Sequence, residues 1–295
     1  MSPGAGTPPD PPAALLEIRP LRAADQDRVL ELVADVWDGH DYIAEAFDRW
    51  IADPGAWFQG AELDGFLVGL QRLRPLGPGL LWYEGLRVKS SHRRQGIARR
   101  MLAGALAQAL AMGFREIRLV TANPAARGLF ESAGFRLLVS PRLWEAGRIE
   151  GGEPARIPAP DEAPALAEMV RADPALSAYG GVTADFNGAR DLDAIELGRL
   201  AGMGRLRVGA GGRALAVIRP ARNRARLNVT FLAGRGGALR DLLMALRVEA
   251  DADDLEGVSL AAPPEHPAAG DLEAVGYDLR PDFQGHIYSL RTLTG

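Results

Sequence analysis

Residues 84–102, EGLRVKSSHRRQGIARRML, combine features that suit the binding of an anion. An apolar strand pattern ends at Val88, a polar turn holds Arg93 and Arg94, and Gly96 opens a helix pattern. The first backbone amides of a helix have no partner within it and lie at the positive end of its dipole. A glycine there lets a phosphate approach the backbone closely. The stretch therefore predicts a pyrophosphate-binding loop between a strand and a helix.

Two other phosphate-binding motifs do not fit this stretch. A Walker loop ends in Gly-Lys-Ser/Thr, which is absent here. A dinucleotide fingerprint has three glycines after the first strand of a βαβ unit, whereas this loop has one glycine after the fourth predicted strand. Both alternatives are therefore set aside.

A carboxylate, Glu84, stands on the predicted strand that leads into the loop. Strict alternation along LLWYEGLRV places Trp82, Glu84, Leu86 and Val88 on one face, and Tyr83, Gly85 and Arg87 on the other. A carboxylate between an indole and apolar neighbours is suited to general-base catalysis. In the alternative interpretation, Glu84 pairs with Arg72 or Arg74 of the preceding strand and only holds structure.

The elements that would position these residues begin near residue 15. Alternating and helical patterns follow in the order βααβββαβαβ, with the glycine loop between the fourth strand and the third helix. The order predicts an α/β fold in which helices flank a mixed, mostly antiparallel sheet.

The same order of patterns starts again in the second half of the chain. VSLAAPPEHPAAGDLEAVGY echoes IRLVTANPAARGLFESAGF, and ARIPAPDEAPALAEMV echoes EIRPLRAADQDRVLELV. We therefore expect a disordered Pro-rich lead over residues 1–13, a first domain over 14–147, a linker over 148–154 and a second domain of the same fold over 155–295.

Two signatures together resemble the GNAT superfamily of N-acetyltransferases. RRQGIA resembles its R-x-x-G-x-G/A loop, and NPAARGLFESAGF resembles its second signature, an asparagine followed by a short helix and Gly-Phe. The predicted order of strands and helices up to about residue 143 is also similar to that of the superfamily.

The resemblance implies an acetyl-CoA-dependent N-acetyltransferase and a set of cofactor-binding residues. The pyrophosphate would lie on the amides around Gln95, Gly96, Ile97 and Ala98, with Arg93 and Arg94 at the entrance. The pantetheine arm would run beside the backbone of Leu86 and Val88 and meet Asn123. The sequence departs from the superfamily at Phe130, which stands where a tyrosine often protonates the leaving thiolate. A thiolate is a fair leaving group near neutral pH, so it could leave without that donor.

The acceptor pocket of the superfamily usually involves the segment between the first two helices. Here that segment offers Asp41 and Tyr42, which, with Trp82, we expect to bind a small amine substrate. In the alternative interpretation, Asp41 is a helix cap. DGHDY, Trp50 and EGLRV also resemble the histidine N-acetyltransferase-like branch, which implies a free amino acid as acceptor.

The signature in the second domain is degenerate. Its loop, LAGRGGALRDLL, is shortened, and Pro264 stands where the first domain has Asn123. We expect this domain to pack against the first without catalysis. The alternative is a second active site at residues 234–237.

The composition limits the functions that remain. The 295 residues carry a formal net charge of −4, which disfavours general nucleic-acid binding. No cysteine is present, which excludes disulfides, thiolate metal sites and the passage of an acyl group through a cysteine. The four histidines show no metal-ligand spacing, so no metal is expected. No signal peptide or membrane span is expected, which fits a cytoplasmic protein. A catalytically silent acyl-CoA sensor and a protein N-acetyltransferase remain as alternatives.

Overall fold

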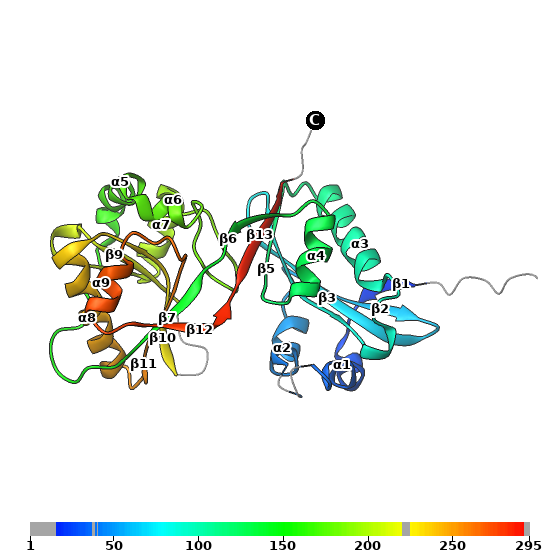
Figure 1. Ribbon diagram of the computed structural model, residues 1–295. Helices are drawn as coiled ribbons and strands as arrows, with labels where there is room; N and C mark the ends of the chain where they lie inside the picture. Colours follow the sequence, from blue (N-terminus) through cyan, green and yellow to red (C-terminus); the bar gives the residue numbers. More distant parts are fainter. Residues whose placement is uncertain (1–15, 37–38, 40, 220–224, 292–295) are drawn as a thin grey trace, which may run out of the picture. The chain divides into compact units, whose positions relative to one another are not determined.

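The computed structural model describes residues 16–36, 39, 41–219 and 225–291 (Figure 1). The predicted Pro-rich lead, and Asp38 and His40 of the DGHDY segment, lie outside the described residues. The chain divides into two compact units, residues 1–115 with 294–295, and residues 116–293. Each unit is described by itself below.

Unit 1 contains four consecutive antiparallel strands. They are β1 (Glu17–Pro20), β2 (Trp57–Leu63), β3 (Phe66–Gly77) and β4 (Leu80–Val88). The turn between β2 and β3 is formed by Asp64 and Gly65, whose φ angles of 52° and 80° suit a tight hairpin.

Helices cover both faces of these four strands. The helices are α1 (Gln26–Val33), α2 (Tyr42–Ile51) and α3 (Ile97–Ala111), with short 3₁₀ turns at Ala23–Asp25 (η1) and Ser90–His92 (η3). Apolar residues of α1 and α2 form one core cluster with Phe58, Leu67 and Leu70. Ile97 and Met101 of α3 form a second cluster with Ala61 and Val68. The α2 face and the α3 face of the sheet are therefore distinct surfaces (Figure 1).

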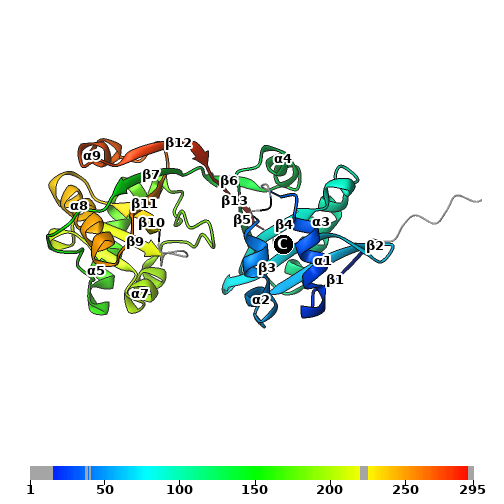
Figure 2. The same cartoon turned by 90° about the horizontal axis from the view of Figure 1, so that it is seen from below.

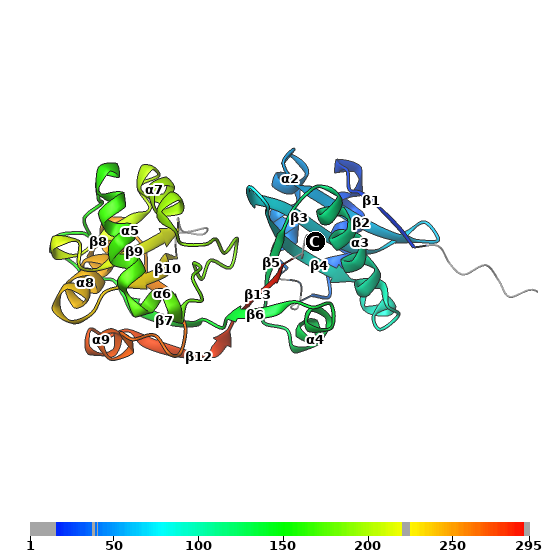
Figure 3. The ribbon, with the colours of Figure 1, turned by 90° about the horizontal axis from the view of Figure 1, so that it is seen from above.

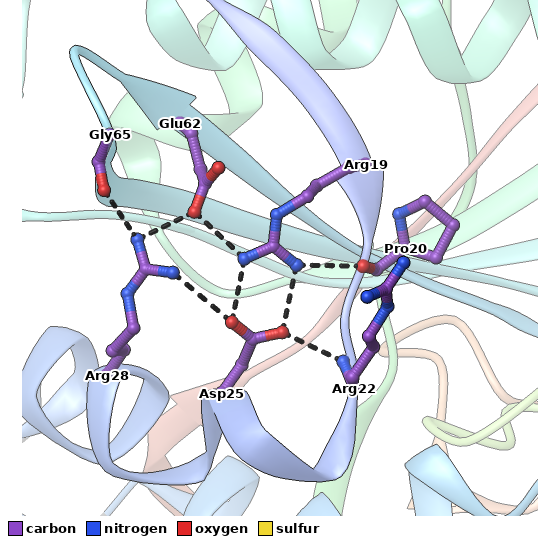
Figure 4. Close-up of polar contacts among 7 residues, drawn as sticks. All are labelled: Arg19, Pro20, Arg22, Asp25, Arg28, Glu62 and Gly65. Carbon is purple, nitrogen blue, oxygen red and sulfur yellow. Dashed lines mark hydrogen bonds and ion pairs between the residues drawn. The ribbon is translucent and has the colours of Figure 1, made fainter.

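A network of ion pairs joins β1, η1, α1 and β2 (Figure 4). Both carboxylate oxygens of Asp25 accept hydrogen bonds from Arg19, at 2.7 and 2.9 Å, and one also accepts from the Arg22 backbone amide at 2.9 Å. Arg19 and Arg28 both contact Glu62, at 2.8 and 2.6 Å. The first turn of the α-helical layer is therefore fixed to the edge of the sheet by charge-assisted hydrogen bonds.

Unit 2 begins with two strands and one helix in the predicted order, and a strand from the end of the chain pairs with both strands. They are β5 (Glu116–Thr121), α4 (Pro124–Ser132) and β6 (Arg136–Val139), with β13 (His286–Arg291) from the end of the chain. β13 lies between β5 and β6 and pairs antiparallel with both. Tyr288 of β13 contacts α4, because its hydroxyl donates to Glu131 at 2.7 Å and accepts from Arg127 at 3.2 Å.

The second sheet of unit 2 has the strand order β12-β7-β11-β10-β9-β8. Its strands are β7 (Arg142–Gly147), β8 (Leu206–Val208), β9 (Leu215–Arg219), β10 (Arg226–Ala233), β11 (Gly257–Ala262) and β12 (Asp278–Gln284). Its helices are α5 (Ala163–Ala172), α6 (Pro174–Ala178), α7 (Ala194–Gly202), α8 (Gly236–Ala252) and α9 (Ala269–Ala274), with 3₁₀ turns at Pro160–Glu162 (η4) and Ala210–Gly212 (η5). β12 lies beside β7 (Figures 2 and 3).

The predicted fold class is confirmed, since two sheets are each flanked by helices. The order βααβββαβαβ is also found up to β6. The strand pairing, however, does not follow the predicted boundary between residues 147 and 155. β7 pairs with β11 and β12 of the second sheet, and β13 pairs with β5 and β6. A strand pattern predicts an extended segment but carries no information on its partner.

Among the described residues, none of the helices is long and apolar enough to cross a membrane.

Candidate functional site

The predicted anion-binding loop forms as a tight turn at the start of α3. Gly96 is the N-cap residue of this 15-residue helix and has a φ of +78°. Arg94 also has a positive φ, of 62°. No atom lies within 4 Å of the position that a Cβ on Gly96 would occupy. The backbone at Gly96 is therefore uncrowded, and the first amides of α3, from Ile97 and Ala98 onward, follow it directly, as in a phosphate-binding helix start.

Hydrogen bonds within the loop hold it in this shape. The Arg93 Nε donates to the Val88 carbonyl at 3.1 Å, and the Gln95 side-chain amide donates to the Ser91 carbonyl at 3.3 Å. Arg93 keeps about half of its side chain exposed, and its guanidinium lies 3.9 Å from Asp35. The entrance to the loop is therefore positively charged and accessible.

The strand that leads into the loop contains a β-bulge at Gly85. Arg72 of β3 lies opposite Glu84, and Leu70 lies opposite Arg87, so one residue of β3 faces two residues of β4. Gly85 has a φ of +72°, which an L side chain rarely adopts. The bulge shifts the alternation of side chains along β4 by one residue.

The predicted alternation along β4 is therefore wrong beyond Glu84. Leu86 and Val88 pack with Ile97 and Met101 on the α3 face. Glu84 pairs with Arg72, whose guanidinium lies 4.9 Å from the Trp50 ring of α2. Glu84 thus lies on the α2 face, opposite the side chains of Leu86 and Val88. The extra residue of the bulge is the physical cause.

Glu84 contacts two guanidinium groups through a single oxygen. Its Oε1 accepts from Arg72 and, at 3.2 Å, from the Nε of Arg74. These are the partners that the structural alternative predicts. Among the described residues, no hydrogen bond to Glu84 Oε2 is found, and the side chain is 14% exposed. Arg72 also pairs with Asp53 after α2, and burial lowers the pKa of its guanidinium.

Asp41 and Tyr42 lie on the same α2 face as Glu84. Asp41 is the N-cap of α2 and accepts from the Ile43 amide at 3.0 Å. Its carboxylate also pairs with Arg87 at 2.6 Å and is completely buried. Asp41 is therefore a helix cap, as the alternative interpretation expects. Its contact with a substrate stays a prediction.

The α2 face collects aromatic rings beside these charges. The Tyr42 and Trp50 rings meet edge to face at 5.9 Å, and the Arg87 guanidinium lies 5.5 Å from the Tyr42 ring. Burial raises the pKa of the Tyr42 hydroxyl. Strict alternation placed Arg87 on the opposite face from Glu84, and the bulge brings it to Asp41. The positive φ of Gly85 that causes this is not visible in the sequence.

Trp82, the third predicted substrate-binding residue, is completely buried, and its indole nitrogen has no hydrogen-bond partner in the described part of the chain.

Asn123 and Phe130 lie on α4 of unit 2. Asn123 is the N-cap of the helix, with its Oδ1 accepting from Ala125 at 2.9 Å, and its own amide donates to Thr121 Oγ1 at 3.1 Å. The residue is exposed. Phe130 is buried, and its ring meets that of Phe135 edge to face at 5.6 Å. Phe130 therefore packs as a core residue of α4.

The corresponding loop of the second half has its amides engaged by the chain's own carboxylates. The Gly234 amide donates to Asp173 at 2.9 Å, and the Gly236 amide donates to Asp271 at 2.9 Å. Asp271 also pairs with Arg240 at 3.2 Å. Asp173 and Asp271 therefore bind the backbone amides that an anion-binding loop would use to bind a ligand.

No group of three or more metal-ligating side chains is found in the described part of the chain.

Comparison with known proteins agrees with this geometry. Residues 22–135 match the model of the acetyltransferase (GNAT) family. This segment contains β2 to β5, α1 to α4 and the loop at Gly96. This part of the chain, less than half of its length, is therefore similar to the acetyltransferase domains of the GNAT family.

Solved structures of the same fold extend over almost the whole chain. A GCN5-related N-acetyltransferase from Sphaerobacter thermophilus covers 94% of this chain and 95% of its own, with a TM-score of 0.62 and 13% identity. One from Kribbella flavida covers 94% of this chain and 71% of its own, with a TM-score of 0.51 and 13% identity. The fold of both halves is thus consistent with two GNAT-like domains in tandem. A search of curated protein sequences gave no match.

Proposed function

We propose that the chain is an acetyl-CoA-dependent N-acetyltransferase that transfers the acetyl group directly to the amine of a small molecule. The observation that carries this proposal is the open loop at Gly96, with the first amides of α3 behind it and Arg93 and Arg94 at its entrance. In this proposal the backbone of Gln95 to Ala98 binds the pyrophosphate of coenzyme A.

The bulge in β4 supports different roles for the two faces of the strand, one for the cofactor and one for the acceptor. The Leu86 and Val88 side chains lie on the α3 face, where the loop begins, and Glu84 lies on the α2 face. The pantetheine arm would run along the backbone of Leu86 and Val88, and Asn123 is the residue proposed to hydrogen-bond its amides. The acceptor amine would approach from the α2 face, near Glu84 and Tyr42.

Glu84 is the proposed general base. Arg72 and Arg74 hold its Oε1, which fixes the direction of the carboxylate, and among the described residues no hydrogen bond occupies Oε2. Oε2 would take a proton from the amine as its nitrogen forms a bond to the acetyl carbon. The carbon–sulfur bond then breaks and coenzyme A leaves as a thiolate, which solvent protonates, since Phe130 cannot donate a proton.

The α2 face supports an amine as the acceptor. A cationic or polar amine could contact the partly buried ring of Tyr42 and the carboxylate of Glu84 on the same face. A free amino acid is the narrower expectation, which rests on the resemblance to the histidine N-acetyltransferase-like branch. The second half is proposed to be a degenerate domain in tandem, because Asp173 and Asp271 bind the amides of its glycine loop.

A turnover assay with matched variants tests this proposal. Coenzyme A release is measured with acetyl-CoA and a panel of small amines, for the wild type, Glu84→Gln and Glu62→Gln. Glu62 is a suitable control because it also pairs with two arginines and is 16% exposed, compared with 14% for Glu84. Glu84→Gln should lower kcat by about 10²-fold or more and keep acetyl-CoA affinity, whereas Glu62→Gln should keep both.

Unchanged turnover in Glu84→Gln would remove Glu84 as the base. Binding of acetyl-CoA by the wild type without turnover of any amine would favour the alternative of an acyl-CoA sensor. Turnover with peptides and none with small amines would favour a protein N-acetyltransferase.

A further inference from the structure

Residues 182–192, between α6 and α7, form a loop that is fixed to the second sheet; we refer to it as the bracing loop (Figure 3, yellow-green). The Ala184 amide donates to the Thr230 carbonyl of β10 at 2.7 Å. Asp185 pairs with Arg219 of β9 at 3.5 Å. The two ends of the loop are joined by a β-bridge between Val182 and Asp191. The loop is therefore a rigid extension of the second sheet.

The same loop is joined to β5 by one completely buried arginine. Arg118 of β5 donates to Asp191 Oδ1 at 2.7 Å and to the Ala189 carbonyl at 3.3 Å. Its Nε donates to Glu116 on its own strand at 2.7 Å. The Arg118 side chain is only 1% exposed. A buried guanidinium with these three acceptors is satisfied only when the loop and the strand keep their positions.

The contact extends to β13, on the face of β5 opposite α4. Ser289 of β13 pairs in register with Arg118, and its hydroxyl donates to Glu116 at 2.7 Å. Burial favours a higher pKa for the Glu116 carboxyl, but the hydrogen bonds from Arg118 and Ser289 outweigh it and lower the pKa. Neighbouring Tyr288 points to α4 instead. One face of β5 and β13 therefore carries α4, and the other carries the bracing loop.

This arrangement connects the bracing loop to a residue of the proposed cofactor site. β5 ends at Thr121, whose hydroxyl accepts from the backbone amide of Asn123. Arg118 precedes Thr121 by three residues, or about 10 Å of extended strand. A shift of β5 at Arg118 would thus displace the cap of α4 and, with it, Asn123.

We propose that Arg118 is a positioning residue for the acyl-CoA site, through which the bracing loop of the second half holds β5 and Asn123 in place. The inference rests on the proposed function and gives the second half a role in cofactor binding without a cofactor of its own.

The test compares two buried arginines of unit 2 in the full-length protein. Arg207 of β8 is the control, because it is also buried, pairs with Glu249 of α8 at 2.8 Å and donates to two backbone carbonyls. Among the described residues, its contacts do not include β5 or the bracing loop. Arg118→Met and Arg207→Met should both lower the melting temperature. Only Arg118→Met should raise the Kd for acetyl-CoA, by about tenfold, a typical coupling between sites. Asp191→Asn, at a half-exposed position, gives a milder variant that should raise the Kd less.

Hydrogen exchange provides a readout that a loss of stability alone would not change. Because coupling between two sites is reciprocal, acetyl-CoA should slow amide exchange in the bracing loop of the wild type. This slowing should be absent in Arg118→Met and present in Arg207→Met. The inference is overturned if the wild type binds acetyl-CoA while Arg118→Met and Arg207→Met bind it equally well. No binding by the wild type would overturn the proposed function as well.

Discussion

Gly85 decides which side chains share a face of β4. Its φ of +72° is one that an L side chain rarely adopts, and a Cβ built on it would lie only 3.0 Å from the Trp50 indole. Both features require a glycine. The bulge that it forms directs Glu84 and Arg87 to the α2 face and leaves Leu86 and Val88 on the α3 face. A single residue thus separates the proposed base from the side chains that flank the cofactor strand.

Asp25 is the residue whose charge we expect to matter most for the stability of unit 1. It is buried and accepts hydrogen bonds from Arg19, Arg22 and Arg28. Asp25→Asn should lower the free energy of unfolding by about 2 kcal/mol, because the bonds to charged donors are weakened. Asp27→Asn, on the exposed side of α1, should change it by less than about 0.5 kcal/mol. Chemical denaturation at pH 7 measures both, and equal values would contradict the role of Asp25.

The same carboxylate predicts a dependence of stability on pH. Hydrogen bonds from Arg19 lower the pKa of Asp25 to about 2, compared with about 3.9 in an unfolded chain. A lowered pKa means that the unfolded state binds a proton first as the pH falls. The stabilisation should therefore be complete above about pH 4 and be lost toward pH 2, and Asp25→Asn should show a smaller loss over this interval.

At the level of single residues, the sequence predicts partners better than it predicts faces. The structural alternatives for Glu84 and Asp41 name an arginine of the preceding strand and a helix cap, and both contacts are found. Both depend on short sequence separation or on a known capping preference. The bulge depends on how β3 and β4 pair, and an isolated glycine in a strand leaves this open.

At the scale of elements, the two glycine loops of the chain differ in what their amides contact. The loop before α3 leaves open space at Gly96, whereas the loop before α8 donates to Asp173 and Asp271. The sequence indicates that the second loop is degenerate because it is shortened. It does not indicate that Asp173 and Asp271, which lie 61 and 35 residues away from the glycines they contact, bind its amides.

β13 is the element whose removal should affect the proposed transferase domain most. It lies between β5 and β6, although it comes from the end of the chain. A variant that ends at Gly285 should lose acetyl-CoA binding, because β5 and β6 would each lose their partner in this position. A variant that ends at Arg291 retains all of β13 and should bind normally. Thermal denaturation and cofactor titration of both variants check this, and normal binding without β13 would contradict it.

The sequence does not predict that β7 pairs in the second sheet or that β13 pairs with β5 and β6, and the reason is physical. Both segments have clear strand patterns, but the apolar face of a strand packs equally well in either of two similar sheets. The order of elements up to β6 was predictable because each pattern is local. The choice of sheet is decided by contacts between residues more than 100 positions apart, such as Tyr288 with Arg127.

At the scale of the whole molecule, the family match and the proposed transferase domain do not have the same extent. The match ends at residue 135, but residues 286–291 complete the pairing of β5 and β6. The bracing loop, between these two segments in sequence, contacts β5 through Arg118. The structure of the second half is therefore part of the proposed active domain.

The most direct test of the account is a calorimetric titration of the full-length protein with acetyl-CoA. The variants are Arg93→Ala with Gly96→Pro, which removes a cation and the φ of +78°, and Gly113→Ala as control. Gly113 has a φ of +80°, also with free space around it, at the other end of α3. We predict one site per chain, lost in the double variant and retained in Gly113→Ala. Two sites per chain would contradict the closed second loop, and the absence of both heat and a melting-temperature shift would contradict the acetyltransferase function.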